Sequence, residues 1–229
     1  ELIEKMLGPV KFKPDEALKN DLIGVVNGLA WTSVGGELLQ VEAVVMDGSG
    51  KLELTGSLGD VMKESAKAAH SYIRSAVSSF GIDSNIFKTK DIHIHVPQGA
   101  VPKDGPSAGV TIATAILSAL TGKAVRHSVA MTGEISLTGR VMPIGGLREK
   151  AMAAYKNSIK QVVIPKDNES DLFEVDPIIK ENVEFICVEK LDDVFSVALC
   201  VEKTQKIDLK HAASFKVEQK KSSGDNIAQ

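Results

Sequence analysis

The spacing of apolar and polar positions changes several times along the chain, and each change predicts a different element. Residues 22–32, 36–46 and 48–56 are rich in β-branched side chains and are interrupted by glycines, which predicts strands. Within residues 59–81 the apolar positions recur at alternating steps of four and three, which predicts a long amphipathic helix ending at Gly81. The first part of the chain is therefore expected to be β-rich with one long helix.

A strictly alternating segment follows at residues 91–96. Ile92, Ile94 and Val96 fall on one face of a predicted half-buried strand, and Asp91, His93 and His95 fall on the other. The remaining predicted elements, in chain order, are a helix at 107–121, short strands with tight turns at 128–146, a helix at 147–157, strands at 161–165 and 184–188, and a helix at 191–199.

This order of elements predicts an α/β fold with mixed sheets and packed helices. Glycine and prolines break residues 1–15, which are expected to be a connector from a missing upstream region, because the chain starts at Glu1 within a charged segment. The domain proper is predicted at 16–201. Residues 202–229 lose the apolar periodicity and are expected to form a polar tail that is disordered at its end.

Composition narrows the class of protein. Aromatic residues make up only 4% of the chain, so aliphatic side chains must fill the core. The net charge of −3 implies no basic face for nucleic acid. No apolar stretch is long enough to span a bilayer, and the first residues lack a secretion signal. Cys187 and Cys200 have no metal-binding spacing and are expected to be buried free thiols, so a cytoplasmic protein is predicted.

The segment PKDGPSAG, residues 102–109, contains the first candidate for chemistry. Gly105 and Pro106 favour a helix start, which places Ser107 in a first turn whose backbone N–H groups have no intrahelical partner. Ser107 is then either a helix cap or a nucleophile. The small residues Ala108 and Gly109 favour the nucleophile, because they let a substrate approach while free N–H groups stabilise an oxyanion.

A nucleophilic serine needs a base, and Lys150 is the best placed. Leu147 and Ala154 flank it on the apolar stripe of its predicted helix, so its amine is either desolvated, with a lowered pKa, or reaches water along a packed stem. No histidine has a comparable position. His93 and His95 share a strand face as two metal ligands would, but no third ligand stands at a recognisable spacing.

Several separated motifs resemble one family. PKDGPSAG and AMTGEISLTGRVMPIGGLREKAMAA, residues 130–154, strongly resemble the proteolytic domain of the ATP-dependent Lon proteases, in their bacterial and organellar A-type branch. The segments GLAWTSVGGELLQVEA and TGSLGDVMKESAKAAHSYIRS agree as well. The resemblance covers roughly residues 10–200 and implies the Lon proteolytic-domain fold.

The resemblance implies roles for particular residues. Ser107 matches the nucleophile and Lys150 its partner in a Ser-Lys dyad that hydrolyses peptide bonds through an acyl-enzyme. Thr132 matches a threonine beside the lysine amine, although it is equally an ordinary strand threonine. Supporting or regulatory positions around the family's cleft match a further group of residues, namely Trp31, Glu42, His93, His95 and Asp104.

The ATPase region that drives unfolding in the Lon family is not recognisable in this sequence. A phosphate-binding loop is absent, because the nearest approach, GSGK at 48–51, has Val45 in place of the first glycine and Leu52 after the lysine. The resemblance therefore implies a domain without metal or cofactor, with ATP and magnesium needed only by the missing ATPase region. It also implies unfolded or damaged proteins as substrates and a homohexameric ring in the full-length protein, with neither membrane nor nucleic acid as partner.

Two other functions stay open from the residues. Small-molecule kinases of a related α/β fold hold phosphate with a glycine- and serine-rich loop at a helix N-terminus, and GPSAG is suited to that role. A non-catalytic module is the second, although it would not need both Ser107 and a lysine on an apolar helix face.

Overall fold

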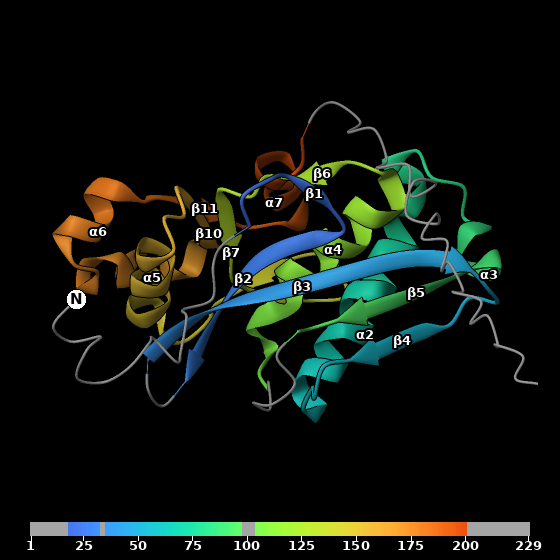
Figure 1. The fold of residues 1–229 in the computed structure, drawn as a ribbon, viewed down its shortest axis with the longest axis horizontal. Helices are drawn as coiled ribbons and strands as arrows, with labels where there is room; N and C mark the ends of the chain where they lie inside the picture. The colour runs from blue at the N-terminus through green and yellow to red at the C-terminus, as the bar shows by residue number, and fades with distance from the viewer. Residues whose placement is uncertain (1–17, 33–34, 98–103, 201–229) are drawn as a thin grey trace, which may run out of the picture.

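A computed structural model of the chain describes residues 18–32, 35–97 and 104–200. The predicted connector at 1–15 and tail at 202–229 lie outside these residues. A seven-stranded mixed sheet forms the centre of the described part, in the order β11-β10-β7-β2-β3-β5-β4 (Figure 1). Its strands are β2 Val25–Thr32, β3 Gly35–Asp47, β4 Leu52–Thr55, β5 Lys90–His95, β7 Val129–Met131, β10 Gln161–Pro165 and β11 Glu184–Val188.

Smaller elements complete the fold. Two antiparallel pairs lie outside the main sheet, one of β1 Leu22–Ile23 with β6 Ala124–Val125 and one of β8 Glu134–Ile135 with β9 Val141–Met142. The α-helices are α2 Asp60–Ala76, α3 Ile86–Thr89, α4 Gly109–Thr121, α5 Leu147–Lys156, α6 Pro177–Asn182 and α7 Leu191–Ala198. The 3₁₀ helices are η1 Val77–Phe80, η2 Pro106–Ala108 and η3 Lys166–Glu174.

Strand β2 joins a parallel half of the sheet to a mainly antiparallel half. It runs parallel to β7 on one side, where β7, β10 and β11 are all parallel. On its other side it pairs with β3 antiparallel over its whole length, from Val25 with Glu42 to Thr32 with Gly35. The β2–β3 pair is therefore the frame on which both halves are built.

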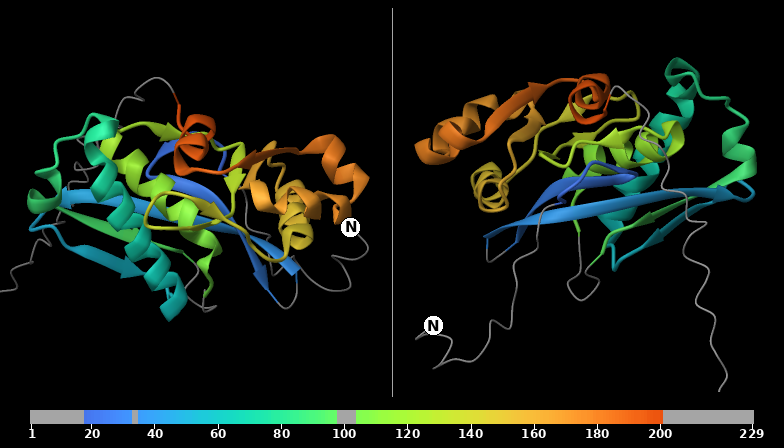
Figure 2. Two further views of the ribbon diagram at one scale, coloured as in Figure 1. Left: turned by 180° about the vertical axis from the view of Figure 1, so that it is seen from behind. Right: turned by 45° about the horizontal axis from the view of Figure 1, so that its top comes forward.

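The two faces of this frame carry different helices. Val26, Leu39 and Val41 belong to a core cluster with residues of α2 and α4, which lie behind β3 and β5 in Figure 1 and in front of them in the left panel of Figure 2. Leu29 and Leu38, which alternate with them, belong to a second cluster with residues of α5. Because successive side chains of a strand point to opposite faces, α4 and α5 pack on opposite faces of the sheet.

The predicted strands and helices are confirmed, with differences at their ends. The long helix ends as η1 before Gly81, whose φ of 72° is one that glycine adopts readily. Helix α6 was not predicted, and the acidic stretch after β10 forms η3. The two cysteines are free but only half-buried, so the expectation of buried thiols is wrong. Cys200 is partly exposed because it follows the end of α7. No helix among the described residues is long and apolar enough to cross a membrane.

Candidate active site

Ser107 lies in η2, the short 3₁₀ turn that leads into α4. The turn begins after Gly105, whose φ of 141° is rarely open to other residues, and Pro106 occupies its first position. The backbone carbonyl of Ser107 accepts hydrogen bonds from the Gly133 N–H at 2.9 Å and from Thr132 Oγ1 at 3.4 Å. The serine is thus held by its own backbone against the segment that follows β7.

Lys150 is buried on α5 with only 2% of its surface exposed. Its neighbours on the apolar stripe, Leu147, Ala151 and Ala154, are buried with it. The ammonium does not reach water along its stem, so the structure excludes that alternative. Burial lowers the pKa of Lys150 to about 8, because removal from water disfavours the charged form.

Thr132 connects the lysine to the serine segment. It comes directly after β7, is 1% exposed, and accepts a hydrogen bond from Lys150 Nζ at 3.0 Å. The same hydroxyl donates to the Ser107 carbonyl, so one side chain contacts elements from both faces of the sheet. This position, at the carboxyl end of a parallel strand, is where ligand sites of open α/β sheets commonly form.

Ser107 and Lys150 line one cavity of about 370 Å³ together with Asp104 and Trp31. Apolar side chains form much of its wall, including Ala30, Leu39, Met62, Ala108, Pro143 and Ile144. Among the described residues, no hydrogen bond joins Ser107 Oγ directly to Lys150 Nζ. This does not count against the pair, because catalytic hydrogen bonds are often long before substrate binds. A hydroxyl and an amine that is readily neutral therefore face one apolar space.

Asp104 and Trp31 lie at the edges of this cavity. Asp104 Oδ1 accepts hydrogen bonds from the Met62 and Gly105 N–H groups, both at 3.0 Å, so its carboxylate points to the start of α2. Trp31 is 61% exposed, and a Cβ added at Gly146, the N-cap of α5, would lie 2.8 Å from its Cγ. Both residues flank the elements that carry the serine and the lysine.

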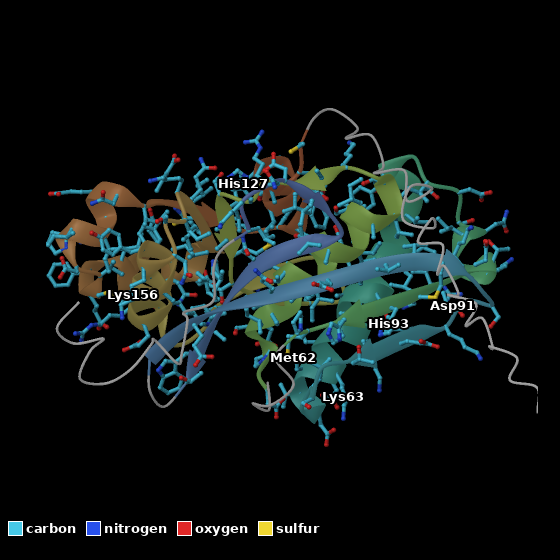
Figure 3. All side chains as sticks on the ribbon, in the orientation of Figure 1. Met62, Lys63, Asp91, His93, His127 and Lys156 are labelled. Carbon is cyan, nitrogen blue, oxygen red and sulfur yellow. The ribbon has the colours of Figure 1, made fainter. Side chains whose placement is uncertain are left out.

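The structure places Glu42, His93 and His95 elsewhere, on the sheet face that carries α5, at the pairing of β3 with β5. Figure 3 labels His93, which lies away from α5. His93 Nε2 and His95 Nδ1 both hydrogen-bond the Thr55 hydroxyl, at 2.9 and 2.7 Å. Glu42 pairs with His95 across β3 and β5. None of the three is among the described residues that line the cavity. No group of three or more His, Cys, Asp or Glu in the described ranges is arranged to hold a metal ion.

Sequence reasoning missed part of the cavity wall. Leu39 and Met62 were not singled out, because apolar periodicity does not separate a core position from a cavity wall. Ser65 carried a usable signal, since it is a serine at a buried position between Met62 and Ala66 of an otherwise apolar face. Its hydroxyl donates to the carbonyl of Pro106 at 3.3 Å, beside the candidate nucleophile.

Comparisons with known proteins show the family to which the chain belongs. The family described as the Lon protease (S16) C-terminal proteolytic domain matches residues 1–201. The chain is 56% identical to a Lon protease of Clostridium acetobutylicum over 197 residues, which cover 86% of this chain and 25% of that protein. It is 52% identical to Lon protease 1 of Myxococcus xanthus over 206 residues, covering 90% of this chain and 25% of that protein. The chain thus spans about a quarter of the length of these relatives.

Proposed function

The chain belongs to the family of Lon protease (S16) C-terminal proteolytic domains, and we propose that it is a serine endopeptidase domain with Ser107 as nucleophile and Lys150 as general base. The observation that carries this proposal is the burial of Lys150 in the cavity that Ser107 also lines. Burial lowers the pKa of Lys150 to about 8, so about a tenth of the amine is neutral at pH 7, far more than for an exposed lysine.

Acylation begins with proton transfer from Ser107 Oγ to the neutral Nζ of Lys150. Oγ bonds to the carbonyl carbon of the scissile peptide, and backbone N–H groups near Ser107 stabilise the negative oxygen. The tetrahedral intermediate then expels the leaving amine, which takes the proton from the Lys150 ammonium. An ester on Ser107 remains and the amine is neutral again.

Deacylation repeats these steps with water. Lys150 removes a proton from a water molecule, whose oxygen attacks the ester carbon. When the second intermediate collapses, Ser107 Oγ leaves and takes back the proton from Lys150, which releases the new carboxyl terminus. Thr132 orients the amine throughout, because its hydroxyl accepts from Nζ and donates to the serine carbonyl.

The proposed chemistry uses the Ser107 and Lys150 side chains, backbone N–H groups and water, and none of its steps is assigned to a metal or a cofactor. The proposed substrates are unfolded or damaged proteins, because this domain's sequence has no recognisable phosphate-binding loop with which to drive unfolding. ATP and magnesium serve only an ATPase region, which the relatives' greater length can accommodate. The hexameric ring stays a prediction from the family resemblance, and the cytoplasmic location stays a prediction from the sequence.

A fluorophosphonate probe with intact-mass detection tests the nucleophile. One adduct is expected on the wild-type chain and none on Ser107→Ala, while Ser71→Ala, at an exposed serine of α2, should react as the wild type does. Hydrolysis of casein should follow the same pattern. Nucleotide binding without any adduct would favour the kinase-type alternative, and silence in both assays would favour the non-catalytic module.

A second experiment tests the substrate class. Casein and a compact globular protein are offered side by side, with and without ATP. We expect cleavage of casein only, at a rate that ATP leaves unchanged. Cleavage of the compact protein that ATP stimulates would contradict the proposal.

A further inference from the structure

The start of helix α2 has no capping side chain of its own. Its N-cap is Gly59, so no nearby side chain accepts from the free N–H groups of the first turn. The N–H of Met62, the third residue of the helix, is instead satisfied by Oδ1 of Asp104 at 3.0 Å. Asp104 stands three residues before Ser107, so the cap of α2 is supplied by the segment that carries the candidate nucleophile.

Gly59 and Asp104 have complementary shapes. A Cβ added at Gly59 would lie 2.3 Å from Cγ of Asp104, closer than such atoms approach. The φ of Gly59 is −69°, which any residue can adopt, so the glycine is required by this contact and not by its backbone conformation. Gly59 therefore occupies an N-cap position where Ser or Asp is usual, and the distant Asp104 supplies the cap instead.

A second hydrogen bond joins the same helix to the same segment. Ser65 Oγ donates to the Pro106 carbonyl at 3.3 Å, and Ser65 is only 8% exposed. Between the two contacts lies Gly105, whose φ of 141° turns the chain toward Ser107. The side chain of Met62 also lines the cavity, so the cap bond fixes a cavity wall and the serine segment to each other.

We propose that Asp104, assisted by Ser65, is a positioning residue that clamps the segment before Ser107 to the first two turns of α2. The clamp sets where Ser107 Oγ lies relative to Lys150 and to the cavity wall. It rests on the proposed function, because it takes Ser107 as the nucleophile. An ordinary helix cap would stabilise α2 without affecting the reactivity of the serine, and the two roles are separable.

Variants that move the cap of α2 from Asp104 to position 59 separate the stabilising role from the positioning role. Asp104→Gly removes the carboxylate and its Cβ, and Gly59→Ser in that background has room to cap α2 locally, because the contacting atoms are gone. Asp104→Gly should lower the melting temperature by about 2–4 °C and slow probe labelling of Ser107 about 10- to 100-fold. The double variant should recover the melting temperature and leave labelling and casein turnover as slow as in the single variant.

Matched variants control for side effects. Asp104→Ala adds no backbone freedom and should label as slowly as Asp104→Gly. Asp60→Ala removes an exposed carboxylate from the same helix end without touching the serine segment, and it should label at the wild-type rate. Ser65→Ala should slow labelling several-fold, whereas Ser71→Ala, on the exposed side of α2, should not.

Three results would overturn the clamp. The first is recovery of labelling together with stability in the double variant, and the second is wild-type labelling in Asp104→Gly or, if that protein does not fold, in Ser65→Ala. The third is independent of catalysis: it is unchanged hydrogen exchange of residues 104–109 in Asp104→Gly, measured by mass spectrometry. The clamp predicts that this exchange rises in Asp104→Gly and stays raised in the double variant. A wild-type chain that never labels refutes the proposed function instead.

Discussion

Two regions on one face of the central sheet differ in what covers them: the middle, at β2–β3, and the end at β5–β4. At β2–β3, α5 packs over Leu29 and Leu38 and carries the buried Lys150. At β5–β4, His93 (labelled in Figure 3) and His95 share the Thr55 hydroxyl and remain partly exposed, and none of the described helices buries them. Burial lowers the pKa of Lys150 to about 8. Coverage by α5 is therefore what makes the Lys150 amine available as a neutral base.

The largest effect is expected from Lys150→Arg. Arginine keeps the positive charge and remains protonated at any working pH, so it cannot act as a base. Casein turnover should fall about 100-fold or more, as in Lys150→Ala, with an unchanged circular dichroism spectrum. Lys156→Arg, at the exposed end of the same helix, is the matched control and should keep the wild-type rate. A folded Lys150→Arg variant with about a tenth of wild-type turnover would lie above that limit and remove the base assignment.

The pH profile sharpens the same point. Since burial lowers the pKa of Lys150 to about 8, the neutral base is scarce below that pH and predominant above it. Turnover of a short unstructured peptide should rise about tenfold between pH 7 and pH 9 and then level off. A rate that is flat over this interval, or that falls, would show that a neutral lysine is not the base.

Thr132→Val tests the contact that orients the amine. Valine keeps the shape of the side chain but leaves Lys150 Nζ without the acceptor it has at 3.0 Å. Because that hydrogen bond favours the charged form, its loss should move the midpoint of the pH profile to lower pH, and turnover should fall about tenfold. Thr132→Ser, which retains the hydroxyl, should restore both quantities. An unshifted midpoint would reduce Thr132 to an ordinary strand threonine.

The smallest effects are expected at the uncovered end of the face. His93→Ala and His95→Ala remove side chains that lie away from the cavity and whose hydrogen bonds go to Thr55. Peptide turnover should stay within about twofold of wild type, in line with the small effect of most surface substitutions. If either histidine variant lost as much turnover as Thr132→Val, the β5–β4 region would also serve catalysis. The contrast between this region and the one covered by α5 would then be wrong.

Much of this site follows from patterns that are local in the sequence. The strict alternation at 91–96 predicted which side of β5 is buried. The stripe through Leu147 and Ala154 placed Lys150 on the apolar side of its helix but left open whether its amine is buried. Local backbone signals placed the helix start at Pro106. Helix α6 was also signalled, because Asp176 caps it and Pro177 is its first residue, but the surrounding acidic residues obscured that pattern.

The rest depends on contacts between distant residues. Nothing near Gly59 indicates that the cap of α2 comes from Asp104, since the two positions meet only after the sheet has formed. The placement of Glu42, His93 and His95 outside the cavity required the strand order β3-β5-β4, which alternation alone does not give. Side-chain period reports which face a residue occupies, but not which helix lies over that face.

The placement of α4 and α5 on opposite faces has a consequence for the newly made chain. Ser107 is synthesised before Lys150, and the two meet only through Thr132, after β2 and β7 have paired. Under the proposed function, a copy still leaving the ribosome has a nucleophile without its base and is inactive until the sheet has formed. The same proposal makes that unfolded copy a substrate for finished domains.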